Sequence, residues 1–146
     1  MISLSLAQAS AIVEAVIATA RELECRPLGV AVLDAGGHLK AFAREDGASI
    51  LRPQIAIGKA WGALGMGMGS RAVAKMAAEG SVQQAFIAAL DGLAGGRVVP
   101  APGGVLVRDA EGQLLGAVGV TGDSSDRDES CAVAAIEGLG LGADPG

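Results

Sequence analysis

The fold is decided by the stretch GVLVRDAEGQLLGAVGVTGDSSDRDESC, residues 104–131. β-branched and apolar residues on both sides of the segment 109–112 predict two strands, and Asp-Ala-Glu-Gly within that segment supplies the residues of a tight turn. The second strand, 114–120, contains Gly116 and Gly119. Glycine weakens a strand unless a neighbouring backbone or a ligand needs the space. The stretch therefore predicts an antiparallel hairpin that something approaches closely.

The acidic residues that follow this hairpin predict the start of a helix. Asp126 has Glu129 three residues later, which is the spacing of a reciprocal N-terminal cap, and Ser125 with Asp128 offers a second register of the same device. Carboxylates at this place also suit a hard cation. Because the spacing of a calcium-binding loop is missing, the helix dipole explains the carboxylates better, and Asp126 and Glu129 are the metal-ligand candidates that remain.

A second hairpin is predicted nearer the N-terminus. The segment GVAVLDAGGHLKAFAR, which begins at Gly29, aligns without gaps to GVLVRDAEGQLLGAVG, which begins at Gly104. The shared residues are turn formers and alternate strand positions, so hairpin geometry explains the match as well as duplication does.

Helices are predicted before, between and after the two hairpins. The predicted elements are a first helix from the Ser5–Gln8 capping box to a point before Pro27, three helices between 53 and 90, a short edge strand at 98–99, a final helix from Asp126 to about Leu139, and a frayed tail at 140–146. The economical way to bury the apolar stripes is a mostly antiparallel sheet with helices packed on it. We therefore expect an α+β fold of about five strands, in a single domain over residues 1–146.

Composition excludes several classes of protein. The chain has 51% hydrophobic, 18% charged and 2% aromatic residues, with a formal net charge of -5. Few rings and a negative charge argue against nucleic-acid binding. There is no apolar run of membrane-spanning length and no basic leader before the first apolar residues, so we expect no membrane contact and a cytoplasmic protein. The many apolar residues suggest that subunits of a homo-oligomer cover part of the surface.

Lys59 is the residue of most chemical interest. It lies on an otherwise apolar helix, between Ile57 and Trp61, where its ammonium group needs an anion. That anion is either Asp46, in a structural salt bridge, or the carboxylate of a ligand, with Arg52 close by in sequence.

The turn before the second hairpin offers parts of a small pocket. Gly103 and Gly104 offer backbone amides to a carboxylate or phosphate, although a plain turn explains them equally well. Together with Lys59 and the glycines at 116–119, they are the parts from which a pocket with a polar mouth would be made. His38 is the only histidine, which argues against a Ser-His-Asp triad and against a multi-histidine metal site.

Three stretches resemble a known family. VAVLDAGGHLKAFAREDGA (30–48), IAIGKA (55–60) and the segment 99–132, which contains the opening stretch, are similar to the GlcG/HbpS-like family of haem-degrading or haem-binding domain proteins. The family also includes the C-terminal domain of some corrinoid adenosyltransferases. The resemblance runs from Leu4 to about Leu139 and implies a profilin-like α/β/α sandwich that assembles into dimers, tetramers or octamers.

The residues that match the family's motifs mark where the resemblance places a site. They are Asp46 and Gly47 in its Asp-Gly-Ala turn, Lys59 and Ala60 in its Lys-Ala helix, Gly103 and Gly104 in its Pro-Gly-Gly turn, and Gly116, Gly119, Gly122, Asp126 and Glu129 in its closing strand and helix cap. Some members bind haem through a histidine. In this chain the candidate axial ligands are His38, Met66, Met68, Lys59 and Thr121.

The sequence thus predicts a small oligomeric protein that binds haem or a small carboxylate-bearing molecule, through Lys59, Arg52, Gly103, Gly104 and Thr121. One alternative is an enzyme acting on a small organic acid, with Lys59 or Asp46 as acid and base. Another is an accessory subunit of an operon-encoded enzyme, with no ligand of its own.

Overall fold

The structure is a computed structural model and describes residues 2–146. The elements of this part of the chain are α1 (Leu6–Glu22), β1 (Gly29–Asp34), β2 (Leu39–Arg44), α2 (Arg52–Met66), α3 (Ser70–Ala77), α4 (Ser81–Leu93), β3 (Gly104–Arg108), β4 (Leu114–Thr121), α5 (Ser125–Gly138) and β5 (Gly142–Asp144). The strands form one sheet in the order β2-β1-β4-β3-β5, and every neighbouring pair is antiparallel.

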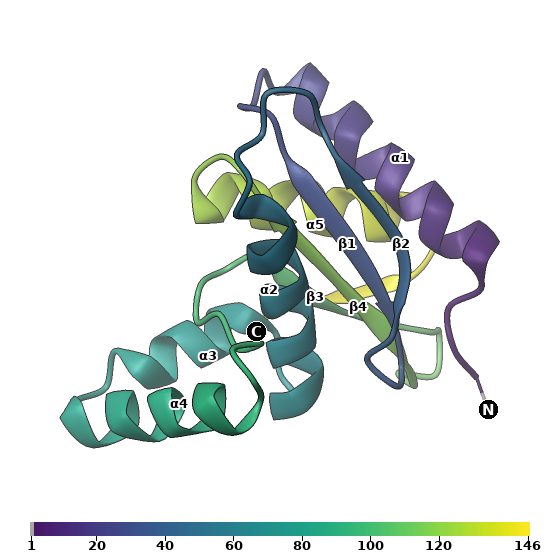
Figure 1. Ribbon diagram of the computed structural model, residues 1–146. Helices are drawn as coiled ribbons and strands as arrows, with labels where there is room; N and C mark the ends of the chain where they lie inside the picture. Colours follow the sequence, from purple (N-terminus) through teal and green to yellow (C-terminus); the bar gives the residue numbers. More distant parts are fainter. Residues whose placement is uncertain (1) are drawn as a thin grey trace.

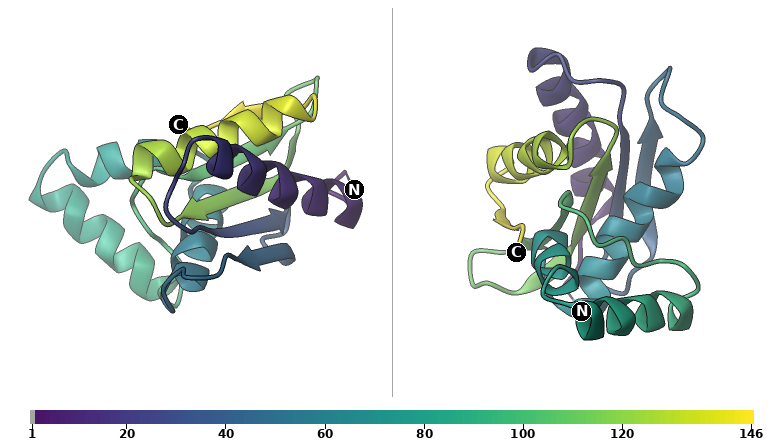
Figure 2. Two further views of the ribbon diagram at one scale, coloured as in Figure 1. Left: turned by 90° about the horizontal axis from the view of Figure 1, so that it is seen from above. Right: turned by 90° about the vertical axis from the view of Figure 1, so that its left-hand side faces the viewer.

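The helices cover both faces of this sheet (Figure 1). α1 and α5 pack against each other and against one face, α2 covers the other face, and α3 and α4 project beyond the end of α2 (Figure 2). The three layers confirm the predicted α/β/α arrangement with an antiparallel sheet of five strands.

The two predicted hairpins are present and their turns are built alike. Asp34 Oδ1 accepts the amide N–H groups of Gly36 and His38, at 3.0 Å each. Asp109 Oδ1 accepts the amides at the same two positions of its own turn, at 2.9 and 2.8 Å. An aspartate side chain that pairs with the backbone two residues on is a device that sequence reveals directly.

Glycines let α2 lie unusually close to the sheet. A Cβ atom at Gly119 of β4 would overlap the carbonyl oxygen of Ala56, and one at Gly104 of β3 would overlap the carbonyl oxygen of Lys59. The small core on this face consequently uses alanines of α2, whereas the larger core lies between the sheet and the other two helices. Its large buried side chains include Leu4, Ile12, Val16, Leu28, Val30, Val32, Val105, Val107 and Ile136.

Three local predictions are wrong. Residues 98–99 form no strand. The segment 142–144 is not frayed, because it pairs with the otherwise open edge of β3 and Arg108 forms an ion pair with Asp144 at 3.0 Å. The cap of α5 is neither Asp126 nor Ser125. Ser124 caps this helix by accepting the amide of Arg127, and the helix therefore begins at Ser125, earlier than the capping pattern suggested.

Candidate functional site

Lys59 is buried beside Asp128, not Asp46. Its side chain lies on the sheet-facing side of α2 and is 2% exposed. Nζ donates a hydrogen bond to the carbonyl oxygen of Val120 at 2.9 Å and lies 3.4 Å from Asp128 Oδ2. Asp46 is exposed in the loop after β2, so the predicted pairing of Lys59 with Asp46 is wrong. α2 lies across the end of β4, and Lys59 therefore reaches the first turn of α5.

Burial has a larger effect on the pKa values of this pair than the attraction between its two charges. Burial holds the pKa of Lys59 below its ordinary value, the charge of Asp128 opposes that shift, and the charge of Arg52 adds to it. Burial raises the pKa of Asp128, although the amide of Asp123 and the charge of Lys59 act in the opposite direction. Charged groups removed from water respond in this way. The pair therefore joins α2 to α5, and Asp46 is not part of it.

The turn before β3 is closed by hydrogen bonds within the protein. The Gly104 amide donates to Ser70 Oγ at 2.7 Å, and the Ser70 hydroxyl donates to the carbonyl oxygen of Ala101 at 2.6 Å. A Cβ atom at Gly103 would lie 3.0 Å from Lys59 Nζ. The Gly104 amide, predicted to serve an anion, is therefore already paired. Gly104 makes room for the backbone of α2, and Gly103 makes room for the carbonyl of Val120 and the side chain of Lys59.

Arg52 and Thr121, two predicted ligand residues, are in contact. Arg52 Nη1 donates to Thr121 Oγ1 at 2.9 Å, and Thr121 is 1% exposed at the end of β4. A hollow of about 200 Å³ opens beside the half-buried Arg52. We call it the Arg52 pocket, and it is lined by Arg26, Pro27, Gly47, Ala48, Ser49, Arg52 and Gly122.

Two acidic residues of α5 form ion pairs with an arginine of α3. Arg71 forms ion pairs with Asp126 at 2.5 Å and with Glu129 at 2.9 Å. Across residues 2–146, His, Cys, Asp and Glu side chains do not gather in threes in a way that would hold a metal ion. The structure thus gives Asp126 and Glu129 an architectural partner.

The five candidate axial ligands lie in different environments. His38 has a side chain that is 82% exposed, 3.4 Å from Asp34 Oδ1 on the hairpin turn. Lys59 and Thr121 are buried and hydrogen-bonded, as described above. Met68 is half-buried against the apolar cluster that α3 and α4 share. Met66, at the end of α2, borders a hollow.

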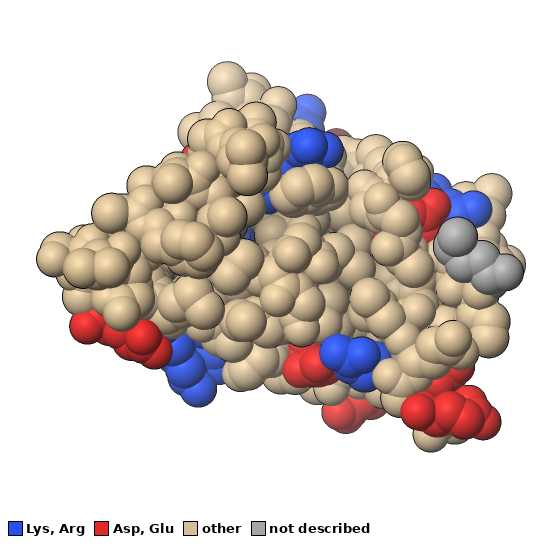
Figure 3. All heavy atoms as spheres, turned by 90° about the horizontal axis from the view of Figure 1, so that it is seen from below, with Lys and Arg blue, Asp and Glu red and all other residues tan. Residues whose placement is uncertain are grey.

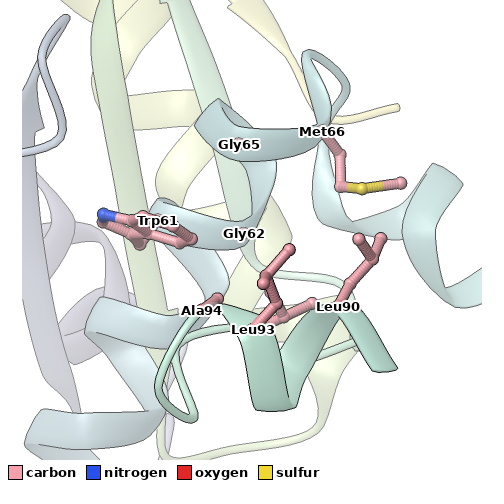
Figure 4. A pocket seen from close by; sticks show the side chains of 8 residues that line it. Trp61, Gly62, Gly65, Met66, Leu90, Leu93 and Ala94 are labelled. Carbon is pink, nitrogen blue, oxygen red and sulfur yellow. The ribbon is translucent and has the colours of Figure 1, made fainter. Parts of the chain in front are cut away.

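That hollow is an apolar groove between α2 and α4 (Figure 4). We call it the α2–α4 groove. It has a volume of about 180 Å³ and is lined by Trp61, Gly62, Gly65, Met66, Leu90, Leu93, Ala94 and Val98. The guanidinium of Arg97 stacks over the ring of Trp61, 4.0 Å from its centroid, and places a positive charge beside this groove-lining residue. This site was not predicted from the sequence. Two spacings are visible signals of it: Gly62 and Met66 are four residues apart on one helix, and Leu90 and Leu93 are three residues apart on another.

The outer side of α4 is apolar and exposed. Val82, Phe86 and Leu93 are 76%, 53% and 86% exposed. Seen from below, the end of the molecule that α3 and α4 form carries few charged side chains (Figure 3). Exposed apolar areas of this kind mark contact sites.

The two cysteines lie side by side in the core. Cys25 and Cys131 are both buried and free, with their Sγ atoms 4.0 Å apart. Burial, together with the neighbouring Cys25, raises the pKa of Cys131 to about 12. The Cys131 thiol is therefore a weak nucleophile, as expected for a structural cysteine.

Solved structures similar to this chain share its entire fold. A crystal structure of a PduOC–haem complex is 26% identical, with a TM-score of 0.84, over 97% of this chain and 98% of that chain. The Klebsiella pneumoniae protein ORFY is 27% identical, with a TM-score of 0.83, over 94% and 90%. A double mutant of Streptomyces reticuli HbpS is 26% identical, with a TM-score of 0.79, over 95% and 88%. No curated protein matches the chain.

An antiparallel sheet between two helical layers, with an apolar groove and an arginine-lined pocket at opposite ends of α2, defines a small α+β ligand-binding domain. The chain belongs to the HbpS-like family of haem-degrading proteins, whose family model matches residues 4–137. Within residues 2–146, every helix is too short or too polar to span a membrane.

Proposed function

We propose that this protein is a cytoplasmic, homo-oligomeric haem-binding protein whose α2–α4 groove receives one edge of the haem. The observation that carries the proposal is the similarity to a haem complex over 97% of the chain, together with an apolar groove that borders a thioether. Two adjacent thiols that remain free suit a reducing compartment, which supports the cytoplasmic location.

The residues of the groove fit haem in kind. Trp61, Leu90 and Leu93 supply apolar walls, Met66 supplies a sulfur atom, and Arg97 supplies a cation for a propionate. When bound, haem contributes an iron that accepts an axial ligand. Of the candidate ligands, Met66 is the one that lies at an apolar hollow, because His38 is exposed on the hairpin turn.

The size of the groove supports an assembly of several copies. Its volume of about 180 Å³ is smaller than the roughly 300–1,000 Å³ of pockets that enclose a ligand. Haem in one chain would therefore keep much apolar surface in water. The exposed apolar side of α4, with Val82, Phe86 and Leu93, adjoins the groove through Leu93, so a second copy of this helix would cover apolar surface of both.

Titration of haemin into the protein, followed at the Soret band, tests this function. We expect a shifted Soret band in the wild type and in Met68→Leu, which is the matched control two residues away. Met66→Leu conserves volume but removes the sulfur, so its spectrum should differ and its binding should be weaker. A Soret band unchanged by the wild-type protein would contradict haem binding and favour the ligand-free accessory role. Identical spectra for all three proteins would remove Met66 from the site.

A further inference from the structure

A separate site lies at the other end of α2. The Arg52 pocket and the α2–α4 groove lie at the first and last turns of this 15-residue helix, roughly 20 Å apart at 1.5 Å per residue. The pocket is made where three loops meet. Arg26 and Pro27 come from the segment before β1, Gly47 to Ser49 from the loop before α2, and Gly122 from the turn after β4.

Arg52 is the residue of this pocket whose positive charge has no carboxylate partner within the described residues. Of the neighbouring cations, Lys59 pairs with Asp128, Arg26 and Arg127 both approach Asp123, and Arg44 donates to the carbonyl oxygen of Ala48. The ion pairs among residues 2–146 leave Arg52 without a carboxylate.

The donors of Arg52 are also underused. A guanidinium carries five N–H donors, and one of them is used on Thr121. The half-buried position removes part of the hydration that would otherwise satisfy the remaining donors. Its positive field is felt inside the protein, because Arg52 contributes to the lowered pKa of Lys59 after the larger effect of burial.

The surroundings select the kind of anion. The acidic groups in the loops around the pocket are engaged or exposed: Asp123 accepts the amide of Arg26 and lies near the side chains of Arg26 and Arg127, Glu45 pairs with Arg21 and accepts the amide of Leu28, and Asp46 is exposed. A volume of about 200 Å³ admits only a small molecule. The planar fork of a guanidinium matches a carboxylate with two parallel hydrogen bonds.

We propose that the Arg52 pocket binds a small organic carboxylate, with the guanidinium of Arg52 holding the carboxylate and Thr121 fixing the orientation of the guanidinium. Ser49 and Arg26 also line the pocket, so the remainder of the ligand meets these two residues. This site does not depend on haem, so the two proposals succeed or fail separately.

Amide chemical-shift mapping with acetate, oxalate and inorganic phosphate as probes tests the site. We expect the carboxylates to move the amide signals of Ser49, Arg52, Thr121 and Gly122 saturably, and phosphate to bind more weakly. Signals that do not move, or move linearly without saturation, would overturn the proposal. Phosphate binding as tight as that of the carboxylates would overturn the assignment of the ligand class.

Two variants of Arg52 test whether the pocket needs the planar guanidinium group or only its positive charge. Arg52→Lys keeps the charge but lacks the fork, and Arg52→Gln lacks both, so carboxylate affinity should fall by about tenfold or more in each. Arg97→Gln is the matched control, because this arginine lies at the α2–α4 groove. Equal affinity in the wild type and Arg52→Gln would contradict the proposal. The mapping on the wild type decides the question even if a variant fails to fold.

Discussion

Removing the cation from the buried Lys59–Asp128 pair should make the stability of this protein depend on pH in a defined direction. In Lys59→Met, Asp128 remains 1% exposed and keeps the hydrogen bond from the Asp123 amide at 2.9 Å, but no cation is left beside it. Breaking a buried ion pair on one side costs about 3–5 kcal/mol. We expect a loss of this size in the free energy of unfolding at pH 7, a large part of a total of about 5–15 kcal/mol.

The loss should shrink in acid. The pKa of Asp128 is already raised by burial from its model-compound value of 3.8, and loss of Lys59 raises it further. A group whose pKa is raised by folding contributes stability that is complete below the unfolded pKa and is lost as pH rises through the folded pKa. Lys59→Met should therefore approach the wild type below about pH 4 and fall behind it as the pH rises.

Urea unfolding followed by circular dichroism between pH 3.5 and pH 8 measures this. The double variant Lys59→Met/Asp128→Asn is the control, since Asn still accepts the Asp123 amide and carries no charge. It should return to within about 1–2 kcal/mol of the wild type, the cost of one or two hydrogen bonds, and lose the added pH dependence. A loss that is equal at every pH, or a double variant less stable than Lys59→Met, would refute the reasoning.

Three further outcomes are expected. Gly119→Ala should lower the free energy of unfolding by about 1–3 kcal/mol, because the new methyl group meets the backbone of α2. Gly138→Ala has open space around it and should be neutral or stabilising, and thermal melts of both variants measure this difference. Iodoacetamide should modify Cys131 slowly in the folded protein up to about pH 9, since burial and Cys25 raise its pKa to about 12, and mass spectrometry that finds rapid labelling would contradict this. Leu93→Lys should reduce the mass found by light scattering, and a wild-type protein that is already a 14.3 kDa monomer would exclude the proposed assembly.

Local devices were predictable from the sequence because their partners are a few residues apart. The capping box of Ser5 and Gln8 forms both of its hydrogen bonds, at 3.1 and 3.0 Å. The turns at Asp34 and Asp109 use the same aspartate geometry, and the hydrophobic spacing of the hairpins fixes which side faces the core. These elements, with the antiparallel connections they require, were sufficient to predict a sheet with helices on it.

The candidate sites were less predictable because they join residues far apart in the chain. Lys59 was identified as a residue that needs an anion, but the anion, Asp128, lies 69 positions away, and nearness in sequence suggested Asp46 instead. The glycines of β3 and β4 predicted a close approach without saying whether a ligand or α2 makes it. The groove needs α4 to fold back beside Met66, and the periodicity within one helix does not specify the packing between two.

A crystal structure of the protein grown with haemin tests the central claim most directly. We predict density for the macrocycle in the α2–α4 groove, with the iron next to the sulfur of Met66, a propionate near Arg97, and α4 of a second copy over the exposed edge. Haem bound instead at His38 on the hairpin turn, or at the Arg52 end of α2, would contradict the assignment of the groove as the haem site.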